Sequence, residues 1–151
     1  MTVPLRQADA SESHLLAHML FAFNTEFEEE TPAVEELDRG IRRLIEADEA
    51  VFLLVADPPA GFAQLRFRTV TWSTGLTCYL EELYVRPDER GKGFGRTLLD
   101  ECLRVAREHG AVHIELNTSE TDEAARGLYE ATGFTNYDAG GAQMLYYERE
   151  L

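Results

Sequence analysis

Two stretches near the N-terminus carry apolar residues with the period of an amphipathic helix. In the first, Ser11 can cap a helix whose buried side holds Leu15, Leu16, Met19, Leu20 and Phe23. In the second, Thr31-Pro32 is typical of an N-cap followed by proline at the first helical position, ahead of Val34, Leu37, Ile41, Leu44 and Ile45. The two stretches predict consecutive helices, each with one apolar face.

Strand patterns surround these helices. Val3 and Leu5 alternate in a short opening strand, and residues 51–55 form a compact apolar strand that ends before Pro58-Pro59. Residues 62–71 and 77–85 are typical of a hairpin around a turn at residues 73–75. Residues 112–116 alternate as a further strand, and a last pair of strands is predicted at residues 135–137 and 144–148.

Two more helices complete the pattern. One buries Leu98, Leu99 and Cys102 and ends at Gly110, and the other runs from about residue 121 to 131 and stops near Gly133. The order of elements predicts an α/β fold, with about four helices packed on a mixed sheet of about seven strands. No repeat or linker divides the chain, so we expect a single domain spanning residues 1–151.

Charge narrows the range of partners. The chain carries 28 acidic and 14 basic residues, for a net charge of −14. Such a charge disfavours nucleic acid and favours cationic small molecules or basic peptides, although solubility alone can also account for it. No apolar run approaches the ~20 residues that span a bilayer, and the N-terminus lacks the layout of a secretory signal. We therefore expect a cytoplasmic protein that uses no membrane.

Cysteine usage agrees with this compartment. Cys78 and Cys102 are the only two cysteines, too few for a disulfide framework or a metal cluster. We expect two reduced, buried thiols and no metal.

A glycine-rich segment between a predicted strand and a predicted helix carries the main chemical signal. Its sequence is Arg90-Gly91-Lys92-Gly93-Phe94-Gly95-Arg96. Glycines allow bare backbone to approach a ligand, and the helix that follows adds the positive end of its dipole, so the segment suits a phosphate. Arg90, Lys92 and Arg96 add positive charge to a negative protein, and Lys92 is its only lysine. The alternative is a glycine turn that binds nothing.

The spacing excludes two common phosphate sites. Gly-x-x-x-x-Gly-Lys followed by Ser or Thr is absent, so the segment is not a P-loop. Gly91-x-Gly93-x-Gly95 also differs from the Gly-x-Gly-x-x-Gly dinucleotide fingerprint.

The segment resembles the Arg/Gln-x-x-Gly-x-Gly/Ala pyrophosphate loop of the GNAT acetyltransferases. Two further segments match in the right order: the strand Glu82-Leu83-Tyr84-Val85-Arg86-Pro87, and Ala125-Arg126-Gly127-Leu128-Tyr129-Glu130-Ala131-Thr132-Gly133-Phe134. The resemblance implies a mostly antiparallel sheet with splayed central strands. It also implies direct acetyl transfer from acetyl-CoA to an amine, with no acyl-enzyme.

The resemblance assigns the cofactor contacts. Backbone of Leu83, Tyr84 and Val85 is expected to meet the pantetheine arm, and residues 90–96 the pyrophosphate. Many relatives have a pantetheine-binding asparagine where this chain has Asp122, whose ionised carboxylate accepts but does not donate. Asn117 is a candidate substitute.

The same resemblance assigns the proton transfers. Tyr129 matches the family tyrosine that donates a proton to the departing thiolate, and its alternative role is helix packing. The segment Tyr79-Leu80-Glu81-Glu82-Leu83-Tyr84-Val85 resembles the spermidine/spermine (diamine) acetyltransferases, which makes Glu81 the candidate base and Glu82 a contributor to cation binding. Strand alternation predicts that these two carboxylates lie on opposite faces, and either can instead be a solvated surface charge.

The resemblance also implies that acceptor determinants lie in the first two helices and the loop that joins them. Glu26 and Phe27 begin an acidic run there, and Trp72 in the hairpin can form another wall. Acids beside aromatic rings suit a polyamine-, aminoglycoside- or amino-acid-like amine. A solvated helix end, a protein lysine or N-terminus as the acceptor, and a non-catalytic acyl-CoA sensor remain alternatives. Homodimers are frequent in the family, so a homodimer is a further expectation.

Overall fold

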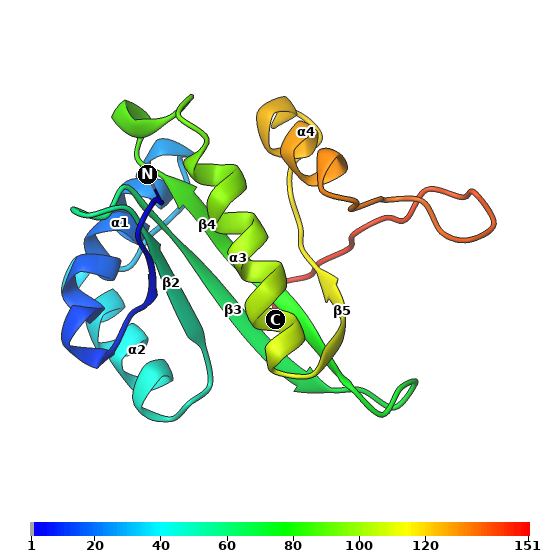
Figure 1. The fold of residues 1–151 in the computed structure, drawn as a ribbon, viewed down its shortest axis with the longest axis horizontal. Coiled ribbons are helices and arrows are strands. Elements are labelled where there is room, and N and C mark those ends of the chain that lie inside the picture. Colours follow the sequence, from blue (N-terminus) through cyan, green and yellow to red (C-terminus); the bar gives the residue numbers. More distant parts are fainter. Residues whose placement is uncertain (1) are drawn as a thin grey trace. The chain divides into compact units, whose positions relative to one another are not determined.

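The computed structural model describes residues 2–151, and Met1, the first residue of the expected domain, lies outside them (Figure 1). The chain consists of two compact units, Met1–Leu116 and Asn117–Leu151. The first unit holds the sheet and three of the α-helices, and the second holds the remaining α-helix and the C-terminal segment.

A five-stranded sheet organises the first unit. Its strands follow chain order: β1 (Leu5–Gln7), β2 (Val51–Val55), β3 (Gly61–Thr69), β4 (Leu76–Val85) and β5 (Ala111–Glu115). The first four strands pair antiparallel, and β4 pairs with β5 in parallel. The predicted mixed, mostly antiparallel sheet and its β3–β4 hairpin are therefore confirmed.

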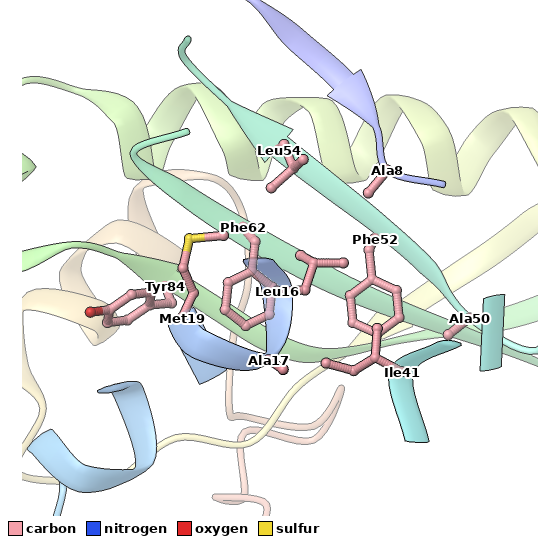
Figure 2. Packing of buried hydrophobic residues seen from close by; sticks show 10 residues of the cluster. All are labelled: Ala8, Leu16, Ala17, Met19, Ile41, Ala50, Phe52, Leu54, Phe62 and Tyr84. Atoms are coloured by element: carbon pink, nitrogen blue, oxygen red, sulfur yellow. The ribbon is translucent and has the colours of Figure 1, made fainter. Parts of the chain in front are cut away.

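Helices cover both faces of this sheet (Figure 1). On one face, α1 (Ser13–Glu26) and α2 (Val34–Glu46) pack over β2, β3 and β4, and a cluster of buried side chains fills the space between (Figure 2). That cluster includes Leu16, Phe52, Phe62 and Tyr84. On the other face, α3 (Phe94–Glu108) contacts β2 to β5 and buries Leu98, Leu99 and Cys102. Alternation along the strands separates the two cores.

Two predicted helix caps are wrong. Asp9, rather than Ser11, is the first cap: its side chain accepts the Ser11 N–H at the start of a short 3₁₀ turn, and α1 begins only at Ser13. The second helix begins at Val34 with Ala33 as its N-cap. Thr31 lies two residues earlier, where its hydroxyl accepts a hydrogen bond from Asn24 and donates to the Pro32 carbonyl.

Both thiols lie in the core of the first unit. Cys78 and Cys102 are buried and free, as predicted. Burial raises the pKa of Cys78 to about 12 and raises that of Cys102 as well, so both thiols stay protonated near neutral pH. None of the helices within residues 2–151 has the length and apolar character needed to cross a membrane.

The second unit contains α4 (Glu123–Ala131), which Asp122 caps and which ends before Gly133 at a positive φ of 96°. The two predicted last strands are not formed: residues 135–148 contain a single isolated bridge, between Tyr137 and Gln143. Asp138 closes a turn there by accepting N–H groups of Gly140 and Ala142. The described residues thus contain five strands instead of about seven: the two predicted segments do meet, since the Met144 N–H donates to the Asn136 carbonyl at 2.7 Å, but their pairing does not extend into a ladder beyond the Tyr137–Gln143 bridge.

Candidate active site

One edge of β4 lacks a strand partner over half of its length. Parallel pairing with β5 ends at Tyr79 and Glu115, so residues 80–85 pair with β3 alone within the described sheet (Figure 1). The Arg86 N–H donates to the Ala60 carbonyl on the β3 side. Because backbone polar groups alternate in direction along a strand, those of Val85 and Leu83 face the open edge. These are the two residues expected to meet a pantetheine arm.

Tyr84 lies between Leu83 and Val85, and its side chain points toward the α1 face of the sheet. Its side chain is only 4% exposed and belongs to the cluster under α1 (Figure 2). The ring stacks on Phe23 with a centroid separation of 5.0 Å. Tyr84 therefore fixes β4 against α1 through packing, and its backbone groups face β3 instead of the open edge.

A β-bulge changes the direction of the two carboxylates on β4. Gln64 of β3 opposes Glu82, and the next residue, Leu65, opposes Leu80, so Glu81 is the extra residue. Residues that oppose each other share a face of the sheet, which places Gln64 and Glu82 together. Yet the Gln64 amide donates to Glu81 Oε2 at 3.2 Å. The prediction that Glu81 and Glu82 lie on opposite faces is therefore wrong, because the bulge interrupts the alternation.

Glu82 has the strongest electrostatic perturbation among the described carboxylates. Its pKa is raised to about 7, first by burial and then by the negative charges of Glu81 and Glu29. Glu29 comes from the loop that joins α1 to α2. We call Glu29, Glu81 and Glu82 the acidic patch. At neutral pH it contains a carboxyl group that is about half ionised, which suits proton transfer.

Residues 90–96, which we call the glycine loop, follow β4 through a 3₁₀ turn at Pro87–Glu89. Gly91 and Gly93 have positive φ values of 80° and 85°, and Gly93 is the left-handed N-cap of α3. Other residues adopt this conformation only with strain. Gly93 has no side chain to cap the helix, so the first amides of α3 are available to an anion. A Cβ built on either glycine meets nothing within 4 Å, so the space beside the backbone is open.

Each cation of the glycine loop has an acidic neighbour. Arg90 forms a bidentate pair with Glu26, with both N···O distances 2.7 Å. Lys92 Nζ lies 2.8 Å from Glu89 Oε2, and Arg96 Nε lies 3.3 Å from Asp100 Oδ1. The positive charge that marks this segment in the sequence is locally balanced in the folded protein.

The expected acceptor residues are not brought together. Glu26 pairs with Arg90 instead of joining the acidic patch. Phe27 packs edge-on against Phe23 and stays 49% exposed. Trp72 lies at the turn of the hairpin, where its ring contacts His113. From Leu76 to Glu82 the strand alone covers roughly 20 Å, so Trp72 does not form a wall near the carboxylates.

Comparison with known proteins shows the family in which the glycine loop and the open edge of β4 occur together. Residues 14–134 match the model of the acetyltransferase (GNAT) family. This chain belongs to the GNAT acetyltransferase family. Membership implies the use of an acyl-CoA, and the glycine loop and the open edge of β4 provide backbone groups that suit one.

Two of the relatives of this GNAT chain described next are named for the small amines they acetylate. A thialysine N-epsilon-acetyltransferase of Caenorhabditis elegans is 29% identical over 113 residues, covering 74% of this chain and 70% of that protein. A streptothricin acetyltransferase of Streptomyces lavendulae is 37% identical over 91 residues, covering 59% of this chain and 46% of that protein. An N-acetyltransferase of Bacillus subtilis, YhfO, is 30% identical over 132 residues, covering 86% of this chain and 88% of that protein.

Solved structures share the GNAT fold. A proposed acetyltransferase from Arthrobacter sp. FB24 is 41% identical with a TM-score of 0.91, covering 98% of this chain and 96% of that one. An aminoglycoside acetyltransferase from an uncultured soil metagenomic sample, in complex with sisomicin, has a TM-score of 0.80 at 15% identity, covering 99% and 96%. The latter likeness shows the fold alone.

Three candidate residues of the GNAT site lie in the second unit. Tyr129 is half-buried on α4 and meets Phe134 edge-on at a centroid distance of 5.8 Å. The Asp122 carboxylate accepts the Ala125 N–H at 3.1 Å and thereby caps α4. Asn117 is exposed at the first position of this unit. Capping explains an acid at position 122 without any cofactor contact.

Sequence reasoning missed Gln64 and gave no role of its own to Glu29. Gln64 is only 6% exposed and holds Glu81 in place. A lone amide in the apolar run at the start of β3 was the available signal. Glu29 appeared only as one member of an acidic run, and the effect of its charge on Glu82 depends on tertiary structure that no local pattern specifies.

Proposed function

We propose that this GNAT protein transfers an acetyl group from acetyl-CoA directly to a primary amine of a cationic small molecule. The observation that carries the proposal is the acidic patch next to the open edge of β4. There Glu82 has a pKa of about 7 and directly precedes Leu83, whose backbone groups face the open edge.

The first unit supplies groups that fit acetyl-CoA. Amides at Gly91, Gly93 and the first turn of α3 would hold the pyrophosphate, and the Leu83 backbone and the Val85 N–H would hold the pantetheine, since the Val85 carbonyl already accepts a hydrogen bond from Arg90. When bound, acetyl-CoA supplies the acetyl group as a thioester. Because an anion at a helix N-terminus is stabilised by unsatisfied N–H groups, this fit does not depend on net positive charge in the loop.

We assign the base to Glu82 in preference to Glu81. An acceptor amine arrives as an ammonium ion and must lose a proton before it can attack a carbonyl carbon. The Glu81 carboxylate already has two partners, since the Gln64 amide donates to its Oε2 at 3.2 Å and Arg66 Nη1 lies 3.9 Å from the same atom. Glu82 lies in more buried surroundings with two like charges, which gives it the proton affinity that a base near neutral pH requires.

The family resemblance assigns the opposite proton transfer to Tyr129, which would protonate the departing thiolate. Tyr129→Phe keeps the ring and removes the hydroxyl. We expect turnover to fall about 10-fold to 100-fold while the Kd for acetyl-CoA stays within about twofold. An equal loss of turnover and affinity would assign Tyr129 a structural role instead.

The acceptor class follows from charge. Three carboxylates in the acidic patch and a net charge of −14 favour a cation. Relatives named for thialysine and streptothricin acetylation support an amine of this kind. A relative named as a peptidyl-lysine acetyltransferase, from Escherichia coli and 31% identical over 100 residues, supports a protein lysine as the second candidate.

An amine panel tests the proposal. Thiol release from acetyl-CoA is followed with thialysine, lysine, a polyamine, an aminoglycoside, streptothricin and lysine-containing peptides, at equal amine concentration. We expect acceptor-dependent release with one or more of the free amines. Thiol release with the lysine-containing peptides alone would show that the acceptor is a protein lysine instead of a small molecule. Saturable CoA binding without thiol release for any amine would indicate a non-catalytic acyl-CoA sensor.

A further inference from the structure

Arg90 is fixed by contacts on three sides. Its Nε donates to the Val85 carbonyl at 2.9 Å, and Nη1 and Nη2 each donate to Glu26 at 2.7 Å. Its guanidinium carbon lies 5.8 Å from the centroid of the Tyr84 ring. The bond to Val85 closes the end of β4 onto the first residue of the glycine loop, and the pair with Glu26 ties both to α1.

Glu26 is an unusual residue for its position in α1. It is the last residue of the helix, where the negative end of the dipole disfavours an acid, and no basic residue lies in that last turn. Local helix stability therefore does not explain it. The hydrogen bond from Arg90 lowers the pKa of Glu26, so the carboxylate stays ionised and the pair stays intact near neutral pH.

We infer that Glu26 is a positioning residue for the cofactor: it orients and neutralises Arg90, which braces the start of the glycine loop instead of contributing free charge to the phosphates. The inference rests on the proposed use of acetyl-CoA. A bidentate pair fixes the guanidinium plane as well as its position, which a single contact cannot do. Loop amides two and three residues further on, at Lys92 and Gly93, are then held in place before the cofactor arrives.

The opposite role makes the opposite prediction. If Glu26 only competed with the pyrophosphate for Arg90, then removing its charge would free the guanidinium and tighten CoA binding. If Glu26 positions Arg90, the same change loosens the loop and weakens binding. The sign of one affinity change therefore separates the two roles.

The test measures CoA affinity of Glu26→Gln by isothermal titration calorimetry. We expect the Kd to rise about threefold to tenfold, and the KM for acetyl-CoA to rise with kcat nearly unchanged. The matched control is Glu101→Gln, because Glu101 also forms a bidentate pair, with Arg104 at 2.5 and 3.0 Å, but on the surface of α3 away from the loop. That variant should keep the wild-type Kd.

A double-mutant cycle completes the test. Arg90→Gln should weaken CoA binding about as much as Glu26→Gln, and the double variant no more than either alone, because Glu26 acts through Arg90. Glu26→Asp, which keeps the charge, should recover part of the loss. Thermal melts show whether each variant is folded.

Each outcome bears on a different claim. A tighter or unchanged Kd in Glu26→Gln, or additive losses in the double variant, would overturn the positioning role while leaving the use of CoA intact. A wild-type protein that shows no saturable CoA binding would overturn the proposed function, and the inference with it.

Discussion

The acidic patch and the glycine loop handle charge in opposite ways. In the glycine loop, Arg90, Lys92 and Arg96 each have an acidic neighbour, so the cations are balanced before any ligand binds. In the acidic patch, burial of the Glu82 carboxyl group and, after it, the like charges of Glu81 and Glu29 raise the pKa of Glu82 to about 7. The loop thus combines paired surface charges with glycines at positive φ, whereas the patch combines like charges with burial.

This difference assigns a different kind of chemistry to each region. A balanced loop with glycines at positive φ recognises an anion mainly through backbone N–H groups, which are fixed by conformation and insensitive to pH. A patch of like charges changes its protonation near neutral pH and attracts cations. Substitutions that change side-chain charge should therefore have large effects on turnover in the acidic patch and small effects on CoA affinity in the glycine loop. Substitutions that change the backbone conformation of the loop should have large effects on CoA affinity.

The largest expected effect is on turnover. Glu82→Gln removes the proposed base at nearly constant shape, and we expect kcat/KM to fall about 100-fold to 1,000-fold at pH 7.5, with CoA affinity retained. Thiol release with the best amine of the panel measures it. A loss below about fivefold would mean that Glu82 does not accept the proton.

The next effect concerns the backbone of the loop. Gly93→Ala forces a side chain into φ 85°, and we expect the Kd for CoA to rise about tenfold or more as the α3 amides shift. Gly110→Ala is the matched control, since Gly110 has a φ of 86° and also has nothing within 4 Å of an added Cβ, but lies at the opposite end of α3. Both variants should lose about 1–2 kcal/mol of stability, but only Gly93→Ala should lose CoA affinity. Equal affinity in the two variants would contradict the loop assignment.

Glu82→Gln should also stabilise the folded protein. Because folding raises the pKa of Glu82 from 4.5 to about 7, the ionised form is disfavoured in the native state. The gain should be about 1 kcal/mol above pH 7 and should disappear below pH 4.5, where the carboxyl group is protonated in both states. Urea unfolding at pH 8 and pH 4 measures it, and equal gains at both pH values would exclude an electrostatic origin.

A smaller effect should appear in the pH profile. Glu81→Gln removes one of the negative charges that raise the pKa of Glu82, so that pKa should fall. The acid limb of kcat/KM should then move to lower pH, with a loss of less than about fivefold on its plateau. A plateau loss as large as that of Glu82→Gln would make Glu81 the base.

The smallest effect is expected at Lys92. Its charge is already paired with Glu89, so Lys92→Met should raise the Kd for CoA only about twofold. A rise of tenfold or more would show that side-chain charge, rather than backbone, dominates phosphate binding.

The sequence was most informative where structure is local. Glycines next to a helix start predicted the geometry at Gly93, and hairpin, helix and family patterns predicted the sheet up to β5. The direction of Glu81 was not predictable, because the bulge depends on the register with β3. The partner of Glu26 lies 64 residues away in the chain, beyond any local pattern. The last two strands were predicted next to each other and do meet at the Tyr137–Gln143 bridge, but alternation alone does not determine how far a ladder extends.

The proton affinity of Glu82 can be measured without any substrate. Carbon-13 NMR of glutamate side-chain carboxyl groups, titrated from pH 3 to pH 9 in wild-type protein and in Glu82→Gln, isolates a single resonance. We predict that the resonance lost in the variant titrates at about pH 7 in the wild type, well above the ordinary value of 4.5 for glutamate. Titration of that resonance near 4.5 would contradict the assignment of Glu82 as the base.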